Sequence, residues 1–482
     1  MGRFFVLYSK IVESGMTKKL WFRILIVLIL IVCLVFLYPT KIVLDVDECV
    51  VLAVAFVCAV LWVTEWLPIP ITSLIPFVCF PLFGVLDGKI VAQSYGHPMI
   101  LLLMGGFILS TALEHSGVHK RFALGILSKL GTQPKNLIGG FLLIGALCSM
   151  WISNTATTLM LLPIAGAIVQ QRKEIAPSIL LAIAYGSSIG GMATPIGTPP
   201  NMILMGMYKE SVNQDISFVM WMTWVLPVVC TFLPLVWWWL CYVSNTQSKN
   251  QIADTTDIVL EDLGIWSTIE KRVVLVFSIT ALLWVTRNNF WGKYVPLAGD
   301  ETVALLAVIF LFVIPSGEES GTALLNWEKA KNIPWGLLIL FGGGIALAKG
   351  FQVSGLSEHI GIWLVDDVGL RNMPLWLSLC ILCLIVTFLT EITSNTATTT
   401  LLMPILIAAG LAANIDPLLW MLPAALSASC AFMLPVATAP NAIVFATGHL
   451  TTQYMAKTGF VVNLIGVVVI SLWMQWSLSF SF

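Results

Sequence analysis

Two identical six-residue motifs of small polar side chains interrupt otherwise apolar sequence in this chain. Each reads Ser-Asn-Thr-Ala-Thr-Thr, one copy beginning at Ser153 and the other at Ser394. A motif containing Pro and Asn follows each copy, beginning at Pro195 and at Pro435. The offsets agree, at 241 residues (394 minus 153) for the first motif and 240 (435 minus 195) for the second. The match predicts a duplicated unit whose two copies carry the same polar site, as is typical of secondary transporters.

The composition indicates that these motifs belong to an integral membrane protein. Of the 482 residues, 58% are hydrophobic and 10% are charged, whereas soluble domains carry about 25% charged residues. Most of the ten cysteines lie in apolar runs, so we expect them to be packing residues and not disulfides or metal ligands. The formal net charge of −1 indicates no particular partner, and we expect no nucleic-acid partner.

The apolar runs predict an all-α polytopic membrane protein of about 11 transmembrane helices. Residues 1–46 form an N-terminal segment with the first of these helices. Its apolar run at 20–38 is long enough to span a bilayer, which takes about 20 residues, and no cleavage site follows it. The predicted simple spans are 20–38, 47–64, 70–86, 97–113, 219–243, 271–290, 298–314, 334–350 and 457–480.

Four further segments contain the repeated motifs and do not resemble simple spans. The stretches 136–171 and 372–410 carry the Ser-Asn-Thr motif at their centres, and we expect each arm to be too short to cross alone, so we predict two re-entrant hairpins with the motif at the tip. The segments 178–208 and 416–448 are too long for one span and are interrupted by the Pro/Asn motif. We predict that both are broken helices.

These elements divide the chain into two repeats. We predict a first repeat at 47–243, a polar cytoplasmic linker at 244–270 and a second repeat at 271–482. Five crossings per repeat is an odd number, so the two repeats must have opposite orientations in the membrane. With the N-terminus in the cytoplasm and the C-terminus outside, most of the 24 Lys and Arg residues fall on the cytoplasmic side, as the positive-inside rule requires.

Weaker matches extend the repeat. Ser116-Gly117 corresponds to Ser354-Gly355, and a Gly-Gly pair precedes each of them. The short amphipathic pieces that follow are predicted to be interfacial connectors. Their neighbourhood contains histidines that we expect to be solvated, namely His115, His119 and His359.

Neither hairpin tip and neither helix break contains Lys, Arg or His. Binding a dianion there without a counter-charge would be costly in a medium of low dielectric. Bound Na⁺ ions would compensate that charge, because free carbonyl, hydroxyl and amide oxygens coordinate Na⁺, while helix N-termini favour the anion. A neutral substrate would also fit such a site.

On these motifs, the chain resembles the divalent anion:sodium symporter family, the carriers of di- and tricarboxylates and sulfate. The resemblance covers roughly residues 50–480. It rests on the paired Ser-Asn-Thr motifs, on the run from Ser429 to Val444, on Trp62–Pro68, and on Pro334-Trp335-Gly336 leading into Gly342-Gly343-Gly344.

The resemblance implies sodium and substrate sites, residue by residue. The first Na⁺ site would use Ser149, Ser153, Asn154 and Gly197, and the second Thr390, Thr393, Asn395 and Ala437, some through backbone carbonyls. The substrate would meet Ser153, Asn154, Thr155, Thr198, Ser394, Asn395, Thr396 and Thr438. The family also implies a homodimer with an elevator mechanism. The hairpins and broken helices would travel, while the first four and the seventh to ninth helices hold.

We therefore predict a sodium-coupled symporter of a di- or tricarboxylate, with a C4 dicarboxylate such as succinate preferred, in a bacterial inner membrane. A sodium-independent dicarboxylate exchanger or a sulfate carrier of the same fold remains an alternative. An intramembrane enzyme is disfavoured, because no nucleophile with a base and no metal-binding pattern occurs.

Two acidic residues, Glu65 and Glu391, are predicted at membrane depth, where ionisable groups are usually functional. Glu391 precedes the second tip at the position where the first copy has Met150. It is therefore not part of the duplicated site. We favour a hydrogen-bonding role for it over proton coupling or tuning of that site.

Overall fold

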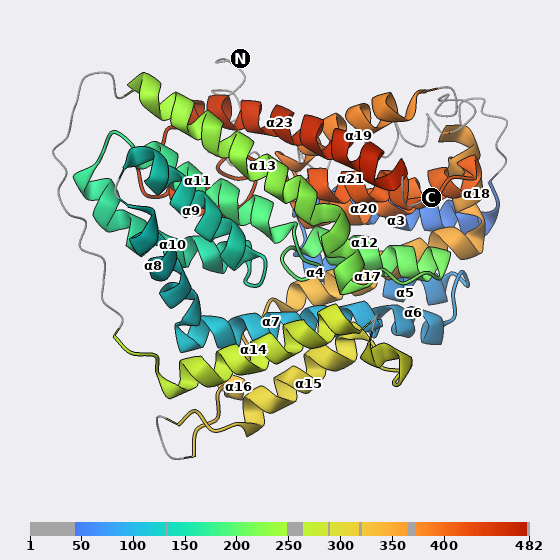
Figure 1. Cartoon of the computed structure of the whole chain (residues 1–482). Coiled ribbons are helices and arrows are strands. Elements are labelled where there is room, and N and C mark those ends of the chain that lie inside the picture. Colours follow the sequence, from blue (N-terminus) through green and yellow to red (C-terminus); the bar gives the residue numbers. More distant parts are fainter. Residues whose placement is uncertain are drawn as a thin grey trace.

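The computed structural model describes residues 44–131, 133–247, 264–287, 290–317, 321–364 and 373–479. Within these ranges the secondary structure is helical (Figure 1), apart from an isolated bridge between Pro315 and Ala323. The predicted all-α fold is confirmed. The predicted first span at 20–38 and most of the linker lie outside the described residues.

The helices follow the order that the sequence predicts. The first half contains α3 (Val46–Thr64), α4 (Ile69–Thr72), α5 (Ile75–Leu82), α6 (Gly88–Tyr95), α7 (Pro98–Ser116), α8 (Val118–Leu130), α9 (Pro134–Ser149), α10 (Asn154–Gln171), α11 (Ala176–Gly191), α12 (Pro199–Val212) and α13 (Phe218–Gln247). The second half contains α14 (Thr268–Thr286), the 3-10 helix η1 (Trp291–Lys293), α15 (Asp300–Val313), α16 (Trp327–Ala330), α17 (Trp335–Ser354), α18 (Leu356–Ile362), α19 (Leu375–Thr390), α20 (Asn395–Ala413), α21 (Leu418–Ala428), α22 (Ala439–Phe445) and α23 (Thr452–Ser479).

Six helical stretches in the described part of the chain are long and apolar enough to cross a membrane. They are Val46–Thr64, Gly88–Ser116, Phe218–Ser244, Trp335–Ser354, Asn395–Ala413 and Thr452–Trp476. Several other apolar helices are shorter, between 10 and 17 residues. The total number of crossings therefore stays a prediction.

The span predicted at 70–86 is not a single helix. The structure divides it into α4 and α5, with a turn at Ser73 and Leu74 between them. Pro76 explains the division, because proline has no N–H to donate to the carbonyl four residues earlier and its ring crowds that carbonyl.

The two predicted hairpins appear as the helix pairs α9–α10 and α19–α20, joined by short turns at 150–153 and 391–394. The two predicted broken helices appear as α11–α12, interrupted at 192–198, and α21–α22, interrupted at 429–438. One expectation about length is wrong. The arm α20 has 19 residues and is long and apolar enough to cross a membrane alone.

The first hairpin and the first broken helix pack backbone against backbone. A Cβ atom added to Gly186 of α11 would lie 2.3 Å from the carbonyl oxygen of Leu142, and one added to Gly190 would lie 2.2 Å from that of Ala146. Only glycine permits this approach between α9 and α11, which is a common way to pack membrane helices closely. Figure 1 shows α9, α10 and α11 packed side by side.

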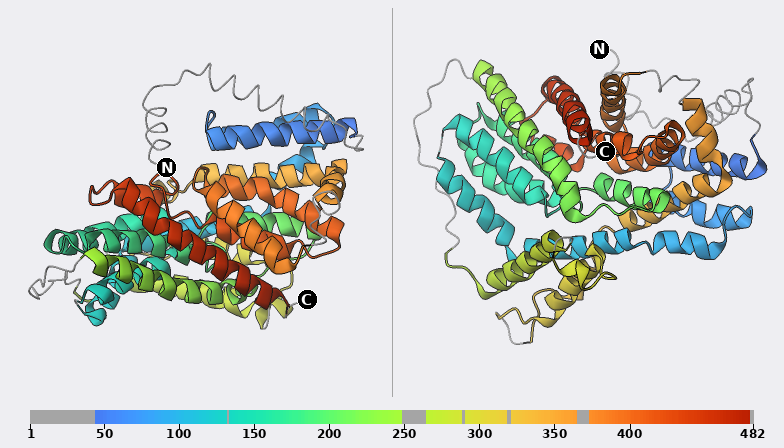
Figure 2. Two further views of the ribbon diagram at one scale, coloured as in Figure 1. Left: turned by 90° about the horizontal axis from the view of Figure 1, so that it is seen from above. Right: turned by 45° about the vertical axis from the view of Figure 1, so that its right-hand side comes forward.

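The two halves of the chain interlock around the motifs. Helix α10 of the first half contacts α22 of the second, and α12 contacts α20 and α21. The hydroxyl of Tyr185 in α11 donates to the carbonyl oxygen of Phe432 in the second break, at 2.9 Å. The last helix, α23, lies alongside α13 and α19 (Figures 1 and 2). The hairpins and breaks therefore form one packed interior.

Candidate functional site

The first hairpin tip is organised by a serine on each side of the turn. Ser153 caps α10, because its Oγ accepts the N–H of Ala156 at 3.2 Å. Ser149, the last residue of α9, donates its hydroxyl to Oδ1 of Asn154 at 2.6 Å. The side chain of Asn154 is therefore fixed by the opposite arm of its own hairpin.

The second tip repeats this arrangement. Ser394 caps α20 by accepting the N–H of Ala397 at 3.1 Å. Thr390, the last residue of α19, donates to Oδ1 of Asn395 at 2.8 Å. In each tip, a hydroxyl side chain holds the amide oxygen of the asparagine five residues later. The duplication predicted from the motifs thus extends to individual atomic contacts.

The first helix break approaches the first tip at Gly191. A Cβ atom there would lie 2.5 Å from Oδ1 of Asn154 and 3.2 Å from the carbonyl oxygen of Gly197. The structure therefore places Asn154, its partner Ser149 and the Gly197 carbonyl beside one another. Hydroxyl, amide and carbonyl oxygens in this combination are suitable ligands for Na⁺.

The second site also gathers oxygens around a hydroxyl. Oγ1 of Thr390 lies 2.8 Å from Oδ1 of Asn395 and also 2.8 Å from the carbonyl oxygen of Ala428. One hydroxyl proton cannot be donated fully to both acceptors. Such crowding of oxygen atoms suits a cation. Ala437, the other residue expected here, is buried in the second break.

Thr393 uses its side chain within its own hairpin. Its hydroxyl donates to the carbonyl oxygen of Leu389 at 2.9 Å and lies 2.5 Å from the hydroxyl of Thr398. The hydroxyl of Thr393 is therefore oriented by its own hairpin, while its oxygen lone pairs and the backbone carbonyl both stay suitable for Na⁺. Its role at the second sodium site stays a prediction.

An asparagine closes each helix break. Asn201 in α12 and Asn441 in α22 each donate their side-chain amide to the carbonyls ten and seven residues earlier. The distances are 3.0 and 2.7 Å for the carbonyls of Gly191 and Thr194, and 2.9 and 3.0 Å for those of Ala431 and Leu434. These bonds satisfy carbonyls that the breaks would leave free in an apolar setting. The motifs alone do not predict this role, although both residues end the Pro/Asn motif.

Glu391 supports the second break and has no acidic counterpart in the first. Its carboxylate accepts four hydrogen bonds, from the backbone N–H groups of three consecutive residues and from a side-chain amide. The donors are Phe432 (2.7 Å), Met433 (2.8 Å), Leu434 (3.0 Å) and Nδ2 of Asn463 (2.8 Å). The structure thus places Glu391 in a hydrogen-bonding role, with the broken helix as its main partner. Glu65 instead ends α3 in a left-handed conformation (φ 49°), and its side chain is exposed.

The predicted substrate residues lie at the starts of four helices: α10, α12, α20 and α22. Ser153 and Ser394 accept a backbone N–H, which leaves their own hydroxyl protons for an anion. Helix N-termini carry partial positive charge and favour anions. The remaining predicted contacts are Thr155, which is exposed, Thr396 and Thr438, which are half-buried, and Thr198, which is buried.

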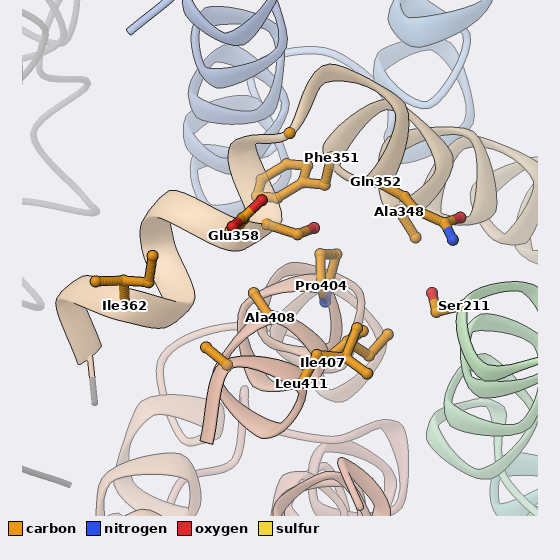
Figure 3. A pocket seen from close by; sticks show the side chains of 13 residues that line it. Ser211, Ala348, Phe351, Gln352, Glu358, Ile362, Pro404, Ile407, Ala408 and Leu411 are labelled. Atoms are coloured by element: carbon orange, nitrogen blue, oxygen red, sulfur yellow. The ribbon is translucent and has the colours of Figure 1, made fainter. Parts of the chain in front are cut away.

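No hydrogen bond among the described residues joins the two tips directly, so a common substrate site between them stays a prediction. A cavity of about 390 Å³ lies elsewhere, between α12, α17, α18 and α20 (Figure 3). Its wall includes Pro404 and Ile407, together with Glu358. None of the predicted sodium or substrate residues lines it, so it does not replace the tips as the candidate site.

Comparison with known proteins places the chain among membrane carriers. Residues 59–425 match the citrate transporter family. The sodium-dependent dicarboxylate transporter SdcS of Staphylococcus saprophyticus is 40% identical over 444 residues, covering 88% of this chain and 84% of that protein. The Staphylococcus aureus protein of the same name is 38% identical over 464 residues, covering 92% and 88%.

A solved structure supports the fold. The YdaH transporter of Alcanivorax borkumensis superposes with a TM-score of 0.58, covering 82% of this chain and 90% of that one. The two sequences are 15% identical. At that level, the similarity concerns the arrangement of helices and not the substrate.

Proposed function

Because this chain belongs to the divalent anion:sodium symporter family, we propose that it carries a dicarboxylate or tricarboxylate together with Na⁺ ions. In this proposal Na⁺ is the coupling ion, and a C4 dicarboxylate such as succinate is the preferred substrate. The relatives named above are sodium-dependent dicarboxylate transporters. A transporter, and not an enzyme, is the class to which this family belongs.

The duplicated contact between a hydroxyl and an asparagine carries the proposal. Ser149 with Asn154, and Thr390 with Asn395, each present oxygen atoms without a neighbouring Lys, Arg or His in the motif. Two Na⁺ ions bound there would offset the charge of a dianion that meets the tips. Without them, bringing the dianion into a poorly solvated site would be unfavourable. Cation and anion would then bind cooperatively.

We propose an elevator mechanism in which α9–α12 and α19–α22 travel together, while α3–α7 and α14–α17 hold. The close packing of α9 on α11, and the contacts of α10 with α22 and of α12 with α20, support treating the travelling elements as one body. We further propose inverted repeats, a homodimer and a bacterial inner membrane, with the N-terminus in the cytoplasm and the C-terminus outside.

Uptake of labelled succinate into proteoliposomes loaded with choline tests the function. External Na⁺ should support uptake and external choline should not, and unlabelled fumarate, citrate and sulfate would rank the substrates by competition. Undiminished uptake in choline would contradict sodium coupling. Uptake that instead required internal dicarboxylate would identify an exchanger, and competition by sulfate alone would identify a sulfate carrier.

A further inference from the structure

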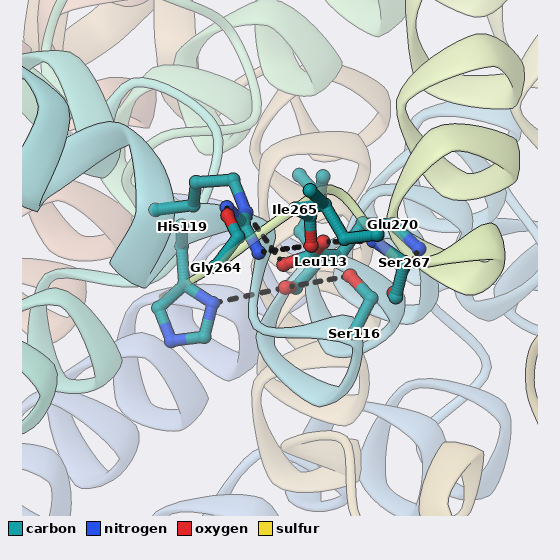
Figure 4. A network of polar contacts seen from close by, with 8 residues as sticks. Leu113, Ser116, His119, Gly264, Ile265, Ser267 and Glu270 are labelled. Carbon is teal, nitrogen blue, oxygen red and sulfur yellow. Dashed lines mark hydrogen bonds and ion pairs between the residues drawn. The ribbon is translucent and has the colours of Figure 1, made fainter. Parts of the chain in front are cut away.

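Arg121 of the connector helix α8 contacts residues at the start of α14 and just before it, including Glu270, Gly264 and Ile265, which Figure 4 labels. Nε of Arg121 lies 2.8 Å from Oε1 of Glu270, and the guanidinium also donates to the carbonyl oxygens of Gly264 (2.8 Å) and Ile265 (3.2 Å). The same group lies over the ring of Trp266, 5.1 Å from its centroid. The side chains of the ion pair are 14% and 9% exposed, so solvent screens this contact less than an ordinary surface pair.

The second connector, α18, is tied to the start of α3 in the corresponding way. Nδ1 of His359 lies 2.5 Å from Oε1 of Glu48. The carboxylate is nearly buried, at 3% exposed, while the histidine is 41% exposed. His359 is partly solvated, as expected, but it also contacts a partner that lies 311 residues away in the sequence, which the motifs did not predict.

The two contacts occupy equivalent positions of the repeat. Arg121 follows Gly117 by four residues, and His359 follows Gly355 by four. Both glycines link a Gly-rich helix to its connector in a left-handed conformation, with φ 79° and 85°. The acidic partners, Glu270 and Glu48, are each the third residue of their helix.

Each of these glutamates is also fixed at its own helix start. Glu270 accepts the N–H of Ser267 at 2.7 Å, and Glu48 accepts that of Asp45 at 2.8 Å. The capping contact therefore orients each glutamate independently of its basic partner. Each pair crosses between the halves of the chain, because the connector of one half reaches the first described helix of the other.

We propose that these pairs are two symmetry-related clamps that fix α8 and α18 to the holding helices α14 and α3 throughout the transport cycle. The inference deepens the proposed function, since it assigns the connectors to the stationary part of the elevator. The packing of α18 on the hairpin arm α20 is the surface that must then slide. At Gly361 the two backbones approach closely, since a Cβ atom there would lie 2.4 Å from the carbonyl oxygen of Ala408, so this contact must be released during the cycle.

A third ion pair provides the contrast. Nζ of Lys349 in α17 lies 2.8 Å from Oε1 of Glu210 in α12. This pair joins a holding helix to a travelling one, so it must separate during the cycle if the elevator assignment is right. It is therefore a matched control for the clamps.

Reversible cross-linking distinguishes the two kinds of pair. In a full-length chain whose ten cysteines have been replaced, cysteines are introduced at Arg121 and Glu270, at Glu48 and His359, or at Lys349 and Glu210. A short bis-methanethiosulfonate reagent then links each pair. We expect both clamp links to leave sodium-driven succinate uptake largely intact and the Lys349–Glu210 link to abolish it until reductant is added. Loss of uptake on linking either clamp would overturn the proposal for that connector.

A thermal measurement keeps the inference testable without transport. Arg121→Glu should lower the melting temperature of the detergent-purified protein by a few degrees, and the double variant Arg121→Glu, Glu270→Arg should recover most of that loss. His359→Arg, which introduces the residue of the equivalent position, should not lower it. Additive losses in the double variant would overturn the clamp. If the unlinked protein takes up no succinate, the proposed function fails while this measurement still reports on the pairs.

Discussion

The two polar sites share a hydrogen bond between a hydroxyl and an asparagine but are supported in different ways. In both, a hydroxyl at the end of one hairpin arm holds the asparagine that begins the other. Around the first site, glycines allow close packing. Gly186 and Gly190 of α11 let its backbone pack directly on α9, and Gly191 packs against the side chain of Asn154. The corresponding positions of the second site, 240 residues later, carry Leu426, Cys430 and Ala431.

The second site compensates for the absence of these glycines with a buried carboxylate. Glu391 accepts three backbone N–H groups of the unwound segment, whereas its first-half counterpart, Met150, offers only a carbonyl to the hydroxyl of Thr194. The comparison indicates that the contact between a hydroxyl and an asparagine, which we propose to bind Na⁺, is the part that both halves share. The support of each break is free to differ, by close packing in one half and by hydrogen bonding in the other.

Replacing Glu391 by Met, the residue of the first half, should have the largest effect. Four donors, two of them buried and two half-buried, would lose their acceptor, at about 1–3 kcal/mol each, so we expect a loss of about 4 kcal/mol or more in stability together with loss of uptake. Glu391→Gln should be milder, because the amide oxygen still accepts. Melting temperature and uptake, measured beside the neutral control Met150→Leu, check this. A Met variant as stable as the parent would show that the carboxylate does not support the break.

Asn154→Ala and Asn395→Ala test the shared contact itself. Each change removes an amide oxygen proposed to bind Na⁺ and leaves the hydroxyl of Ser149 or Thr390 without that acceptor. Loss of a contact to a charged ligand costs about 1.5–3 kcal/mol, so uptake should fall about tenfold to a hundredfold. Its dependence on Na⁺ concentration should also weaken. Similar losses in both variants are expected; an unchanged Na⁺ dependence would remove that asparagine from the site.

Gly191→Ala should damage the first site by a steric route. The new Cβ would lie 2.5 Å from Oδ1 of Asn154, and Ser149 holds that oxygen in place. Overpacking of this kind costs about 1–3 kcal/mol, and displacing Asn154 should raise the Na⁺ concentration needed for half-maximal uptake. The reciprocal change, Ala431→Gly, is the control. Equal effects of the two changes on Na⁺ dependence would contradict the different construction of the two breaks.

The sequence was sufficient to locate both tips and both breaks, because short polar motifs stand out in apolar sequence and their duplication argues against chance. The predicted hairpin at 136–171 corresponds to α9–α10 at 134–171, and the predicted break segment at 416–448 corresponds to α21–α22 at 418–445. The division of the predicted span 70–86 into two helices could also have been predicted, since Pro76 removes a helix hydrogen bond.

Contacts between distant residues could not be predicted from periodicity or motifs. The pairs Arg121–Glu270 and His359–Glu48 join residues 149 and 311 positions apart, and only the packing of the connectors brings them together. The acceptors of Asn201 and Asn441 were hidden for another reason. The accepting carbonyls lack helical partners only because the helices break at these positions. The sequence does not predict in which direction the carbonyls of an unwound segment point.

Asn201→Ala and Asn441→Ala should give the smallest effects and the finest test of the difference in support. Each loses donors to carbonyls of its break, which costs about 1–2 kcal/mol. The second break retains Glu391, so Asn441→Ala should lower the melting temperature less than Asn201→Ala. In a Glu391→Gln background the order should reverse, because the amide keeps only one accepting oxygen, both supports of that break are then weakened, and their effects exceed additivity. Strict additivity would mean that the carboxylate and the amide hold the second break independently.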